Sequence, residues 1–367
     1  MSYIQNNQDR LRFAWLSNNG LTYKRHTQIR QEYEDFYTAY EDDFCRINDE
    51  KFVTKFKSLK PKIDKEILKL HNTLMEQDIY LQTLPDKPYP PILRSLNEPP
   101  LAIFYQGDIS VIYKLPKMIT VVGSRDVSEY SKEIMDKILG KICQSGVGVV
   151  SGLAYGVDSY SHQICLDNHA PALAVLGMGL DKDIFYPKEV QFLRDRIVDS
   201  GGLLLSEYLP TTPGNKFTFP RRNRILANLT PITLVVQAKS ESGSMITANE
   251  AFDNNKKVAT FPAHIGSKGY DGNIELIQKK VIIVTEPKDI LGELGVAEVR
   301  SKANKIYKDL SEKDIMIVEA LKGQIRSVED LTKDIEGLTF SELMVSLSML
   351  ELKGIVKNAG LNQWKVV

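Results

Sequence analysis

The sequence predicts an α/β protein built around an extended Rossmann-like, doubly wound parallel sheet, with a helical N-terminal domain and a C-terminal winged helix. Short apolar runs rich in β-branched residues recur between residues 118 and 294, and helical stretches separate most of them. Repeated strand–helix units of this length imply parallel strands that are covered by helices on both faces. Before and after this region the apolar residues recur at helical spacing instead.

The chain before the sheet has two parts. Residues 1–85 are rich in Tyr, Lys, Asp and Glu, with no proline before Pro61. Helical spacing of apolar residues predicts a small helical domain there, from Ile63, Ile67, Leu70 and Leu74. Residues 86–117 form a proline-rich lead-in, where prolines exclude long helices and favour extended segments. Leu101 to Tyr105 fits an edge strand within it.

The Rossmann-like domain, with its lead-in, is expected to span residues 86–295. Its candidate strands are Ile119–Gly123, Val147–Ser151, Ala172–Leu176, Gly202–Ser206, Ile232–Gln237, Lys257–Phe261 and Val281–Thr285. The dinucleotide fingerprint is absent, because Gly177-Met-Gly179 lacks a third glycine at the required place. No P-loop motif occurs anywhere in the sequence.

The C-terminal part reads as a polar linker at residues 296–310 and a winged helix at 311–367. Three helices and a β-hairpin are expected: Asp314–Leu321, Val328–Ile335 and Phe340–Leu352, then Lys353–Val367. Ser327 and Thr339 open plausible capping boxes. The third helix would enter the major groove in a DNA-binding relative, yet it carries Glu342 and Glu351, with Lys353 as its one cation. A partner contact or a weak DNA role is therefore favoured there.

Composition restricts the class of protein. Lys plus Arg and Asp plus Glu both number 47, so a nucleic-acid partner needs locally clustered cations. The three cysteines form neither a disulfide framework nor a metal-binding spacing, and we expect no metal and no cofactor. The N-terminus is polar, and no apolar run approaches the roughly 18 residues of a membrane span. A soluble, cytoplasmic protein with no membrane partner is expected.

Four loops that follow predicted strands carry the residue types that bind phosphate. Carboxyl ends of parallel strands share one edge of a doubly wound sheet, so these loops are expected to share one crevice. The candidate binding residues are Gly123, Ser124 and Arg125; Gly152; Phe217, Phe219, Arg221, Arg222, Asn223 and Arg224; and Ser242, Gly243, Ser244 and Thr247.

The chemistry of this set suits a chain of phosphates. Arginine grips anions with a planar fork, and glycine lets a ligand approach the backbone closely. The helix expected from about Glu129 to Cys143 would place its N-terminal amides behind Arg125. Phe217 and Phe219 add ring faces on which bases could stack, each worth about 1–3 kcal/mol. Single-stranded nucleic acid, bound without base-edge readout, is the natural hypothesis.

Other interpretations of the same residues are weaker. Asp158 and His162 share a helical face and could form an acid–base pair, although a helix-start Asp near a core histidine is commoner. Glu207 and Glu250 could act in hydrolysis, but no second carboxylate is placed beside either. His264 could simply line the sheet edge. The Arg221–Arg224 cluster could bridge helix ends, although three arginines in four positions favour anion binding.

An ordered set of motifs lies between Tyr89 and Leu294. It comprises Tyr-Pro-Pro-Ile-Leu-Arg94, Glu-Pro-Pro-Leu-Ala-Ile-Phe104, Val-Val-Gly-Ser-Arg125, Ser-Gly-Leu-Ala-Tyr-Gly-Val-Asp158, Ala-Val-Leu-Gly-Met-Gly-Leu-Asp181, Tyr186-Pro187, Leu-Leu-Ser-Glu207, Phe-Pro-Arg-Arg-Asn-Arg224 and Ser-Gly-Ser-Met-Ile-Thr-Ala248. This set resembles the DNA processing protein A (DprA, or Smf) family. The winged helix is similar to one attached to many members. The N-terminal part departs, because it has no helix-hairpin-helix Gly-x-Gly signature.

The resemblance implies a bacterial protein that binds single-stranded DNA, forms a homodimer through the Rossmann domain and loads RecA recombinase during natural transformation. Such a protein would protect incoming DNA and is not known for catalysis. Carried over by motif, Gly123, Ser124 and Arg125 would contact a phosphate, with the Arg221–Arg224 loop beside them.

Two other functions compete with this one. The same Rossmann subtype resembles Lonely-Guy-type nucleotide hydrolases and nucleotide-sensing SLOG domains, whose loop reads Pro-Gly-Gly-x-Gly-Thr-x-x-Glu. The corresponding loop here runs from Ser242 to Glu250 and keeps the late glutamate without the Gly-Gly-x-Gly, which weighs against nucleotide hydrolysis. A transcription-factor-like role through the winged helix is the weaker alternative.

Overall fold

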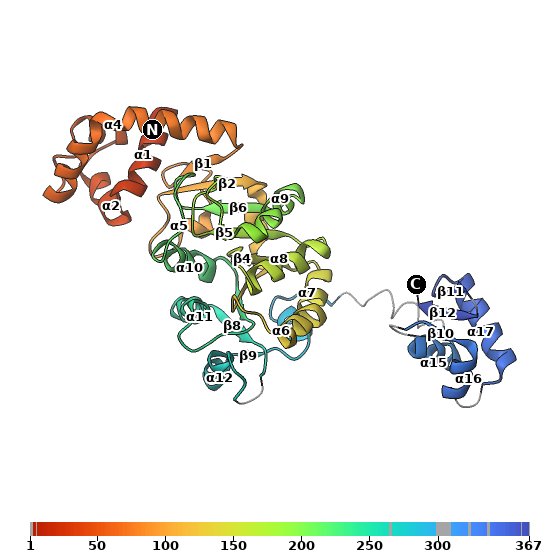
Figure 1. Cartoon of the computed structure of the whole chain (residues 1–367). Coiled ribbons are helices and arrows are strands. Elements are labelled where there is room, and N and C mark those ends of the chain that lie inside the picture. Colours follow the sequence, from red (N-terminus) through yellow and green to blue (C-terminus); the bar gives the residue numbers. More distant parts are fainter. Residues whose placement is uncertain are drawn as a thin grey trace. The chain divides into compact units, whose positions relative to one another are not determined.

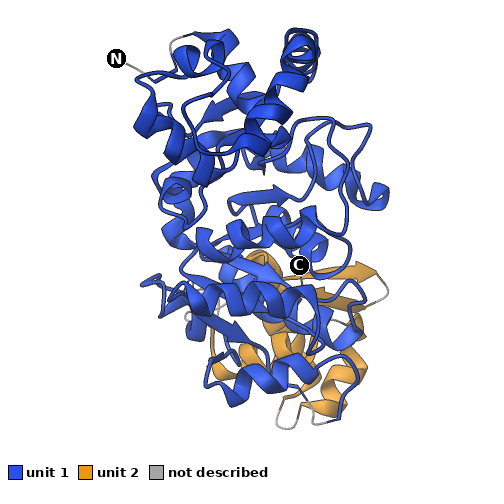
Figure 2. Ribbon diagram, turned by 90° about the vertical axis from the view of Figure 1, so that its left-hand side faces the viewer, with its two compact units in different colours: residues 1–298 blue, residues 299–367 orange. Residues whose placement is uncertain are grey.

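A computed structural model of the chain describes residues 3–4, 6–263, 266–298, 310–321, 324–335, 338–360 and 362–366. The chain divides into two compact units, residues 1–298 and 299–367 (Figure 2). His264 and residues 299–309 of the expected linker lie outside the described ranges. No helix in the described part of the chain combines the length and the hydrophobicity that a membrane span requires.

A sheet of nine strands organises unit 1 (Figure 1). Its order is β1-β2-β6-β5-β4-β3-β7-β8-β9, and every pair from β6 to β9 is parallel. The strands are β1 (Tyr80–Thr83), β2 (Ala102–Gly107), β3 (Met118–Val122), β4 (Gly148–Ser151), β5 (Ala172–Leu176), β6 (Leu203–Ser206), β7 (Ile232–Val235), β8 (Lys257–Thr260) and β9 (Ile282–Ile283). Strands β3 to β7 are buried along their whole length, as their apolar runs predict.

The strand order changes direction between β3 and β7. From β3 the chain adds β4, β5 and β6 on one side, and after β7 it adds β8 and β9 on the other. Right-handed crossovers place the helices of these two halves on opposite faces. The helices of the first half are α6 (Glu129–Ile134), η2 (Met135–Leu139), α7 (Gly140–Gln144), α8 (Val157–Asp167), η3 (Lys188–Val190) and α9 (Gln191–Asp199); those of the second half are α10 (Thr218–Leu229), α11 (Gly243–Asp253), α12 (Asp271–Gln278) and α13 (Lys288–Leu291). The doubly wound sheet is thereby confirmed.

The lead-in differs from the prediction in one respect. Leu101 to Tyr105 was expected to form an edge strand, but β2 is internal and lies antiparallel between β1 and β6. The edge strand is β1, which pairs Tyr80 with Tyr105. Its sequence Tyr-Leu-Gln-Thr is short and half polar, so it gives little strand signal by itself. Two short helices, α5 (Pro91–Arg94) and η1 (Ile109–Lys117), flank β2 in the chain.

The described residues before the sheet are mainly helical, as expected, and form α1 (Asn7–Asn19), α2 (Tyr23–Glu32), α3 (Phe36–Glu41) and α4 (Glu50–Glu76). One hydrophobic core runs from Tyr3 through these helices into the sheet. Asn18 of α1 donates to the carbonyl of Glu207 at 3.3 Å and accepts from the amide of Leu209 at 3.2 Å. The division at residue 85 therefore stays an interpretation, because the helices and the sheet share one core.

Unit 2 contains the three helices and the β-hairpin that its sequence predicts, and one further short strand, Arg326–Ser327, that was not predicted. They are α15 (Glu312–Leu321), β10 (Arg326–Ser327), α16 (Val328–Asp334), α17 (Phe340–Leu352), β11 (Val356–Gly360) and β12 (Gln363–Val366). The strands form a sheet in the order β10-β12-β11. The helices and strands of unit 2 enclose a hydrophobic core of their own. Thr339 and Glu342 form a complete capping box at the start of α17. Ser327 caps α16 by accepting from the amide of Asp330.

Candidate nucleic-acid interface

A crevice of about 490 Å³ lies where the strand order changes direction, at the carboxyl ends of β3 and β7. Open α/β sheets bind ligands at this point of the topology. Ten of the predicted residues line the crevice: Gly123, Ser124, Arg125, Phe219, Arg222, Asn223, Ser242, Gly243, Ser244 and Thr247. All four predicted loops therefore meet here, the second of them through Ala154 and Asp158.

Backbone hydrogen bonds to two neighbouring segments hold the loop after β3 in place. The Ser124 amide donates to the Gln237 carbonyl at 2.7 Å, and the Ser124 carbonyl accepts from the Val157 amide at 3.0 Å. A Cβ on Gly123 would lie 2.6 Å from Cγ2 of Val157, so only glycine lets α8 approach this closely. These contacts fix the backbone and leave the Arg125 side chain exposed at the mouth of the crevice.

A helix N-terminus lines the crevice, but it belongs to α11. Ser242 caps α11, and Gly243 and Ser244 form its first turn. The predicted helix after β3 does exist, but α6 begins at Glu129 and its first turn does not reach the crevice. The α11 N-terminus supplies the partial positive charge and the backbone amides that favour a phosphate.

Arg222 forms the buried floor of the crevice. Its guanidinium donates to the carbonyls of Gly152, at 3.1 Å, and Val175. Burial lowers the pKa of Arg222 and raises the pKa of Asp158. The opposite charge of each group partly offsets the pKa shift of the other. Gly152 lies beneath this floor, and a Cβ there would meet the Arg222 guanidinium. Arg222 and Gly152 thus support the crevice from below.

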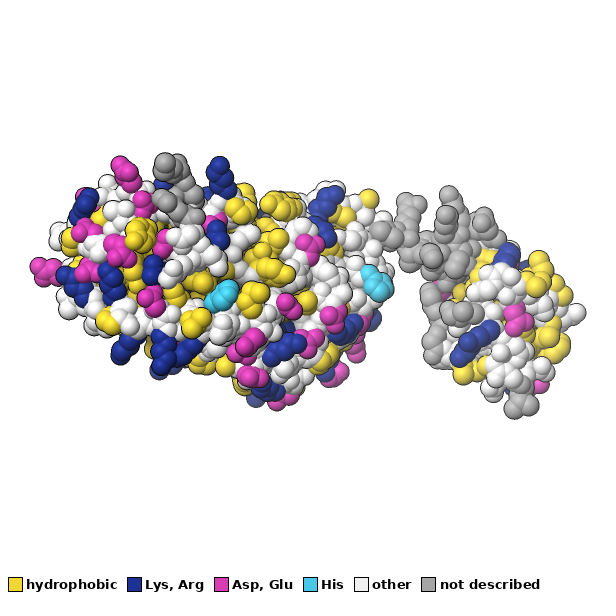
Figure 3. Space-filling view, turned by 90° about the horizontal axis from the view of Figure 1, so that it is seen from above, with side chains coloured by type: hydrophobic (Ala, Val, Ile, Leu, Met, Phe, Trp, Pro, Cys, Tyr) yellow, Lys and Arg dark blue, Asp and Glu magenta, His cyan; other side chains and the backbone are white. Residues whose placement is uncertain are grey.

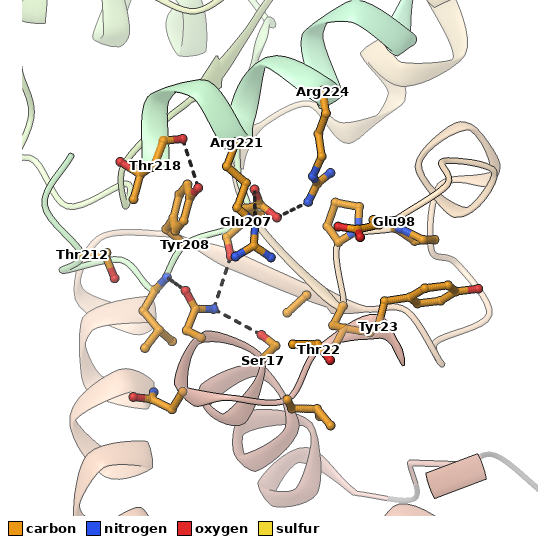
Figure 4. Close-up of a pocket in the computed structure, with 18 of the residues that line it drawn as sticks. Ser17, Thr22, Tyr23, Glu98, Glu207, Tyr208, Thr212, Thr218, Arg221 and Arg224 are labelled. Atoms are coloured by element: carbon orange, nitrogen blue, oxygen red, sulfur yellow. Dashed lines mark hydrogen bonds and ion pairs between the residues drawn. The ribbon is translucent and has the colours of Figure 1, made fainter. Parts of the chain in front are cut away.

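Arg221 and Arg224 point elsewhere, which corrects the expectation that all three arginines share one crevice. The stretch from Phe217 to Arg224 is not a loop, because α10 begins at Thr218 and takes Pro220 in its first turn, where no amide donor is needed. Residues three apart share a helix face, whereas Arg222 lies about 100° around from Arg221. Arg221 and Arg224 therefore line a second cavity, together with Glu207 (Figure 4).

The two phenylalanines have different surroundings. Phe217 immediately precedes α10 and is 73% exposed, with the Lys216 ammonium 5.2 Å from its ring centre. Phe219 is half-buried and fills space beside Gly177 and Gly214, where a Cβ would meet its ring. Phe217 can accept a stacked base, while Phe219 forms part of the crevice wall.

Two cations of the crevice were not predicted. Lys216 and Lys239 both line it, and both side chains are exposed. Lys216 lies just before the predicted loop that begins at Phe217, and Lys239 lies just before the one that begins at Ser242. Loop boundaries set a few residues earlier would have included both lysines. Together with Arg125 they give the crevice three exposed cations, against one exposed acid, Asp126.

Of the groups considered for catalysis, Asp158, His162 and Glu207 are buried, and Glu250 is half-buried. Burial lowers the pKa of His162 to about 3, so the imidazole is neutral at neutral pH. Asp158 accepts the amide of Gly152 at 3.1 Å, which is a structural contact. Glu207 pairs with Arg224, and Glu250 lies in a small separate cavity. In the described ranges no group of three or more His, Cys, Asp or Glu is placed to hold a metal ion.

The sheet, its change of direction and the cationic crevice together define a Rossmann-like protein whose crevice has the residue types that suit phosphate-bearing ligands. A family model described as DNA recombination-mediator protein A matches residues 80–295. The chain belongs to this family.

Relatives from several bacteria agree with this assignment. The DNA processing protein DprA of Bacillus subtilis (strain 168) is 34% identical over 249 residues, which cover 67% of this chain and 82% of that protein. DprA of Streptococcus pneumoniae (strain ATCC BAA-255 / R6) is 38% identical over 208 residues, covering 57% and 72%.

Two solved structures share the fold. The X-ray structure of Streptococcus pneumoniae DprA has a TM-score of 0.66 and 30% identity, covering 79% of this chain and 99% of that chain. A structure of Helicobacter pylori DprA, described for its single-stranded DNA binding mode, has a TM-score of 0.51 and 24% identity, covering 63% and 97%. The second similarity is evidence for the fold alone.

Proposed function

We propose that this protein binds single-stranded DNA in the crevice between β3 and β7 and acts as a recombination mediator in DNA uptake and natural transformation. The observation that carries the proposal is the combination of Arg125, Lys216 and Lys239 with the α11 N-terminus around one crevice. Cations with backbone amides bind successive phosphates, and the exposed Phe217 ring offers a stacking face.

The geometry of the crevice supports the following choice of site residues. Ser124, Arg125, Lys216, Lys239, Ser242, Gly243 and Ser244 are proposed to contact the strand, while Gly123, Gly152 and Arg222 hold the crevice in shape. Phosphate contacts carry no sequence information, so little base preference is expected. On the face that Figure 3 shows, basic and acidic side chains are interspersed over unit 1. Local clustering rather than net charge would therefore attract the DNA.

The wider role is inferred from the family. We propose that the protein protects incoming single-stranded DNA and loads RecA recombinase on it, acts as a homodimer, and works in the cytoplasm without catalysing a reaction. The family description names a recombination mediator, and the curated relatives are DNA processing proteins. Helicobacter pylori DprA, a protein of the same fold, is described as binding single-stranded DNA.

A competition experiment tests the binding proposal. A labelled dT oligonucleotide is bound to the full chain and displaced with unlabelled single strand or duplex at two salt concentrations. We expect the single strand to compete far better than the duplex, and the affinity to fall steeply with salt because counterions are released. Equal competition by the two DNA forms would reject the proposal.

A turnover assay tests the proposed lack of catalysis. Nucleoside monophosphates are incubated with the protein, and the release of free base is measured. We expect no more release than in a protein-free control. Release that exceeds the protein concentration, and that disappears in Glu250→Gln, would assign the protein to the nucleotide-hydrolysing class instead.

A further inference from the structure

A second cavity, of about 790 Å³, lies between the N-terminal helices and the sheet (Figure 4). The end of α1, the start of α2, the proline-rich segment before β2, the loop after β6 and the outer face of α10 enclose it. Of the four predicted phosphate-binding loops, only the one that contains Arg221 and Arg224 contributes residues to this cavity. The proposed function therefore leaves this cavity without a role.

A buried ion pair lies against the wall of this cavity. Arg224 is bonded to Oε2 of Glu207, whose side chain is only 6% exposed. Three further polar atoms of the pair are buried without a hydrogen-bond partner: Oε1 of Glu207, and Nε and Nη1 of Arg224. Buried polar atoms normally have partners, because leaving one unpaired costs about 1–3 kcal/mol. The wall therefore offers both an acceptor and donors to a ligand.

Exposed cations lie at the mouth of the same cavity. Arg221 is 59% exposed, and its Nε lies 3.8 Å from Oε1 of Glu207, too far for a hydrogen bond. Lys24 is exposed in the first turn of α2, beside the N-cap residue Thr22. Cations at a helix N-terminus favour an anion. A ligand that draws Arg221 towards an anionic group would uncover Oε1 of Glu207 for a donor.

We infer that this cavity is a second nucleotide subsite. Arg221, Lys24 and the α2 N-terminus hold a phosphate, and Oε1 of Glu207 accepts a hydrogen bond from an N–H group of the base. Carboxylates accept from base amino groups, such as N4 of cytosine. The ring of Tyr23, which is partly exposed at the mouth, supplies a face beside the base. The ligand class is a nucleotide, either within a strand or free.

The placement of α10 favours a nucleotide within a strand. Phe219 and Arg222 face the crevice, whereas Thr218 and Arg221 face the second cavity, so the first two turns of α10 separate the two sites. An α-helix with its side chains is about 10–12 Å across, which a few nucleotides can span. Lys216 and Phe217 lie exposed at the end of this divide. The inference thus rests on the proposed function and extends its DNA path over α10.

Binding measurements on strands of different length test this inference. The full chain, Arg221→Ala, Arg125→Ala and the control Arg196→Ala are titrated with dC oligonucleotides from a few to about 16 nucleotides, the range of known single-strand site sizes. Free dCMP and an abasic strand of the longest length complete the set. The Arg196 side chain is 42% exposed, pairs with Asp167 and lines neither cavity, so its replacement controls for the loss of one partly exposed arginine.

We expect Arg221→Ala to weaken the binding of long strands about tenfold and to leave the binding of the shortest strands unchanged. The salt dependence of binding should fall by about one phosphate contact. Arg196→Ala should change nothing, and the abasic strand should bind wild type more weakly than dC does. Loss of dCMP binding in Arg221→Ala, without any dependence on strand length, would overturn the strand path and assign the subsite to free nucleotides.

Two further outcomes separate this inference from the proposed function. If Arg125→Ala weakens every probe and Arg221→Ala weakens none, the second subsite is rejected and the crevice stands. If Arg221→Ala weakens binding and Arg125→Ala does not, the crevice is rejected and this cavity is the main site. Arg221 is exposed and outside the core, so its replacement leaves the fold intact.

Discussion

Two regions of this protein could bind DNA, and they differ in what they expose. The crevice between β3 and β7 exposes Arg125, Lys216 and Lys239 around a helix N-terminus. The α17 helix of unit 2, which would read the major groove in a DNA-binding winged helix, contains no lysine or arginine. Its exposed residues are two glutamates, two serines and a set of apolar side chains: Phe340, Val345, Met349 and Leu352.

The comparison shows that a helix can occupy the position of a DNA-reading helix and still lack the side chains that bind DNA. DNA affinity depends on neutralising phosphates, and each neutralised phosphate needs a cation or a well-placed amide. The crevice has these groups and α17 lacks them. An apolar exposed helix face is typical of a protein contact rather than a DNA contact. The two tryptophans, Trp15 in unit 1 and Trp364 in unit 2, allow each unit to be followed separately.

The largest expected effect concerns the crevice floor. Arg222→Ala leaves Asp158 buried without its opposing charge and two carbonyls without a donor, which should cost about 3–5 kcal/mol in the free energy of unfolding. Urea denaturation of unit 1, followed by Trp15 fluorescence in a Trp364→Phe background, measures it. Arg125→Ala is the control and should change stability by less than about 0.5 kcal/mol. A change in Arg222→Ala of similarly small size would show that this arginine is not structural.

The next effect is on affinity. Arg125→Ala should weaken single-stranded DNA binding by about 1–3 kcal/mol, the range for a hydrogen bond to a charged group. Lys239→Ala should weaken it less, because an ammonium makes a point contact instead of a bidentate one. Each change should flatten the salt slope by about one contact. Fluorescence anisotropy with a dT oligonucleotide at several salt concentrations measures both, and unchanged binding in both variants would exclude the crevice.

Acid should distinguish the two units, since all five histidines precede residue 265. Burial lowers the pKa of His162 to about 3 and that of His26 to about 4 in the folded state. Between these values and about 6.5, the unfolded chain binds protons that the folded chain does not. Unit 1 should therefore lose stability as pH falls below 6.5, by up to about 1.4 kcal/mol per pH unit for each histidine.

Unit 2 should respond only at lower pH. Hydrogen bonds from Thr339 lower the pKa of Glu342 to about 2, and a hydrogen bond from Ser327 lowers that of Asp330. Stabilisation by these carboxylates is present above their ordinary pKa values, near 4, and is lost as pH falls below them. Urea titrations at pH 7, 6 and 5 with the two single-tryptophan variants compare the units. Two results would contradict the role of the buried histidines. One is an equal loss of stability in both units between pH 7 and 5. The other is a loss in unit 1 that is no smaller in His162→Gln than in the unchanged chain.

The sequence predicted the crevice better than it predicted the arginines. The carboxyl ends of parallel strands lie at a common edge of the sheet. The sequence alone therefore predicted that Gly123, Arg125 and Ser242 lie close together. The face of α10 on which each arginine lies depends on where the helix starts, and Phe217-Thr-Phe-Pro220 looked like a loop. One residue of shift turns a side chain by about 100°. The pairing of β1 with β2 was missed because it is long-range and β1 is half polar.

The smallest expected effect comes from removing unit 2. A chain that ends at Glu298 keeps the whole compact unit that contains the crevice, so it should fold and bind single-stranded DNA with nearly unchanged affinity. The reason is that α17 offers acidic and apolar side chains to a polyanion, and phosphate contacts dominate the affinity. Anisotropy measurements on the truncated and full chains, with Arg125→Ala made in both, decide the comparison. If truncation abolishes binding while Arg125→Ala has no effect in the full chain, DNA is held by unit 2, and the apolar face of α17 contacts DNA rather than protein.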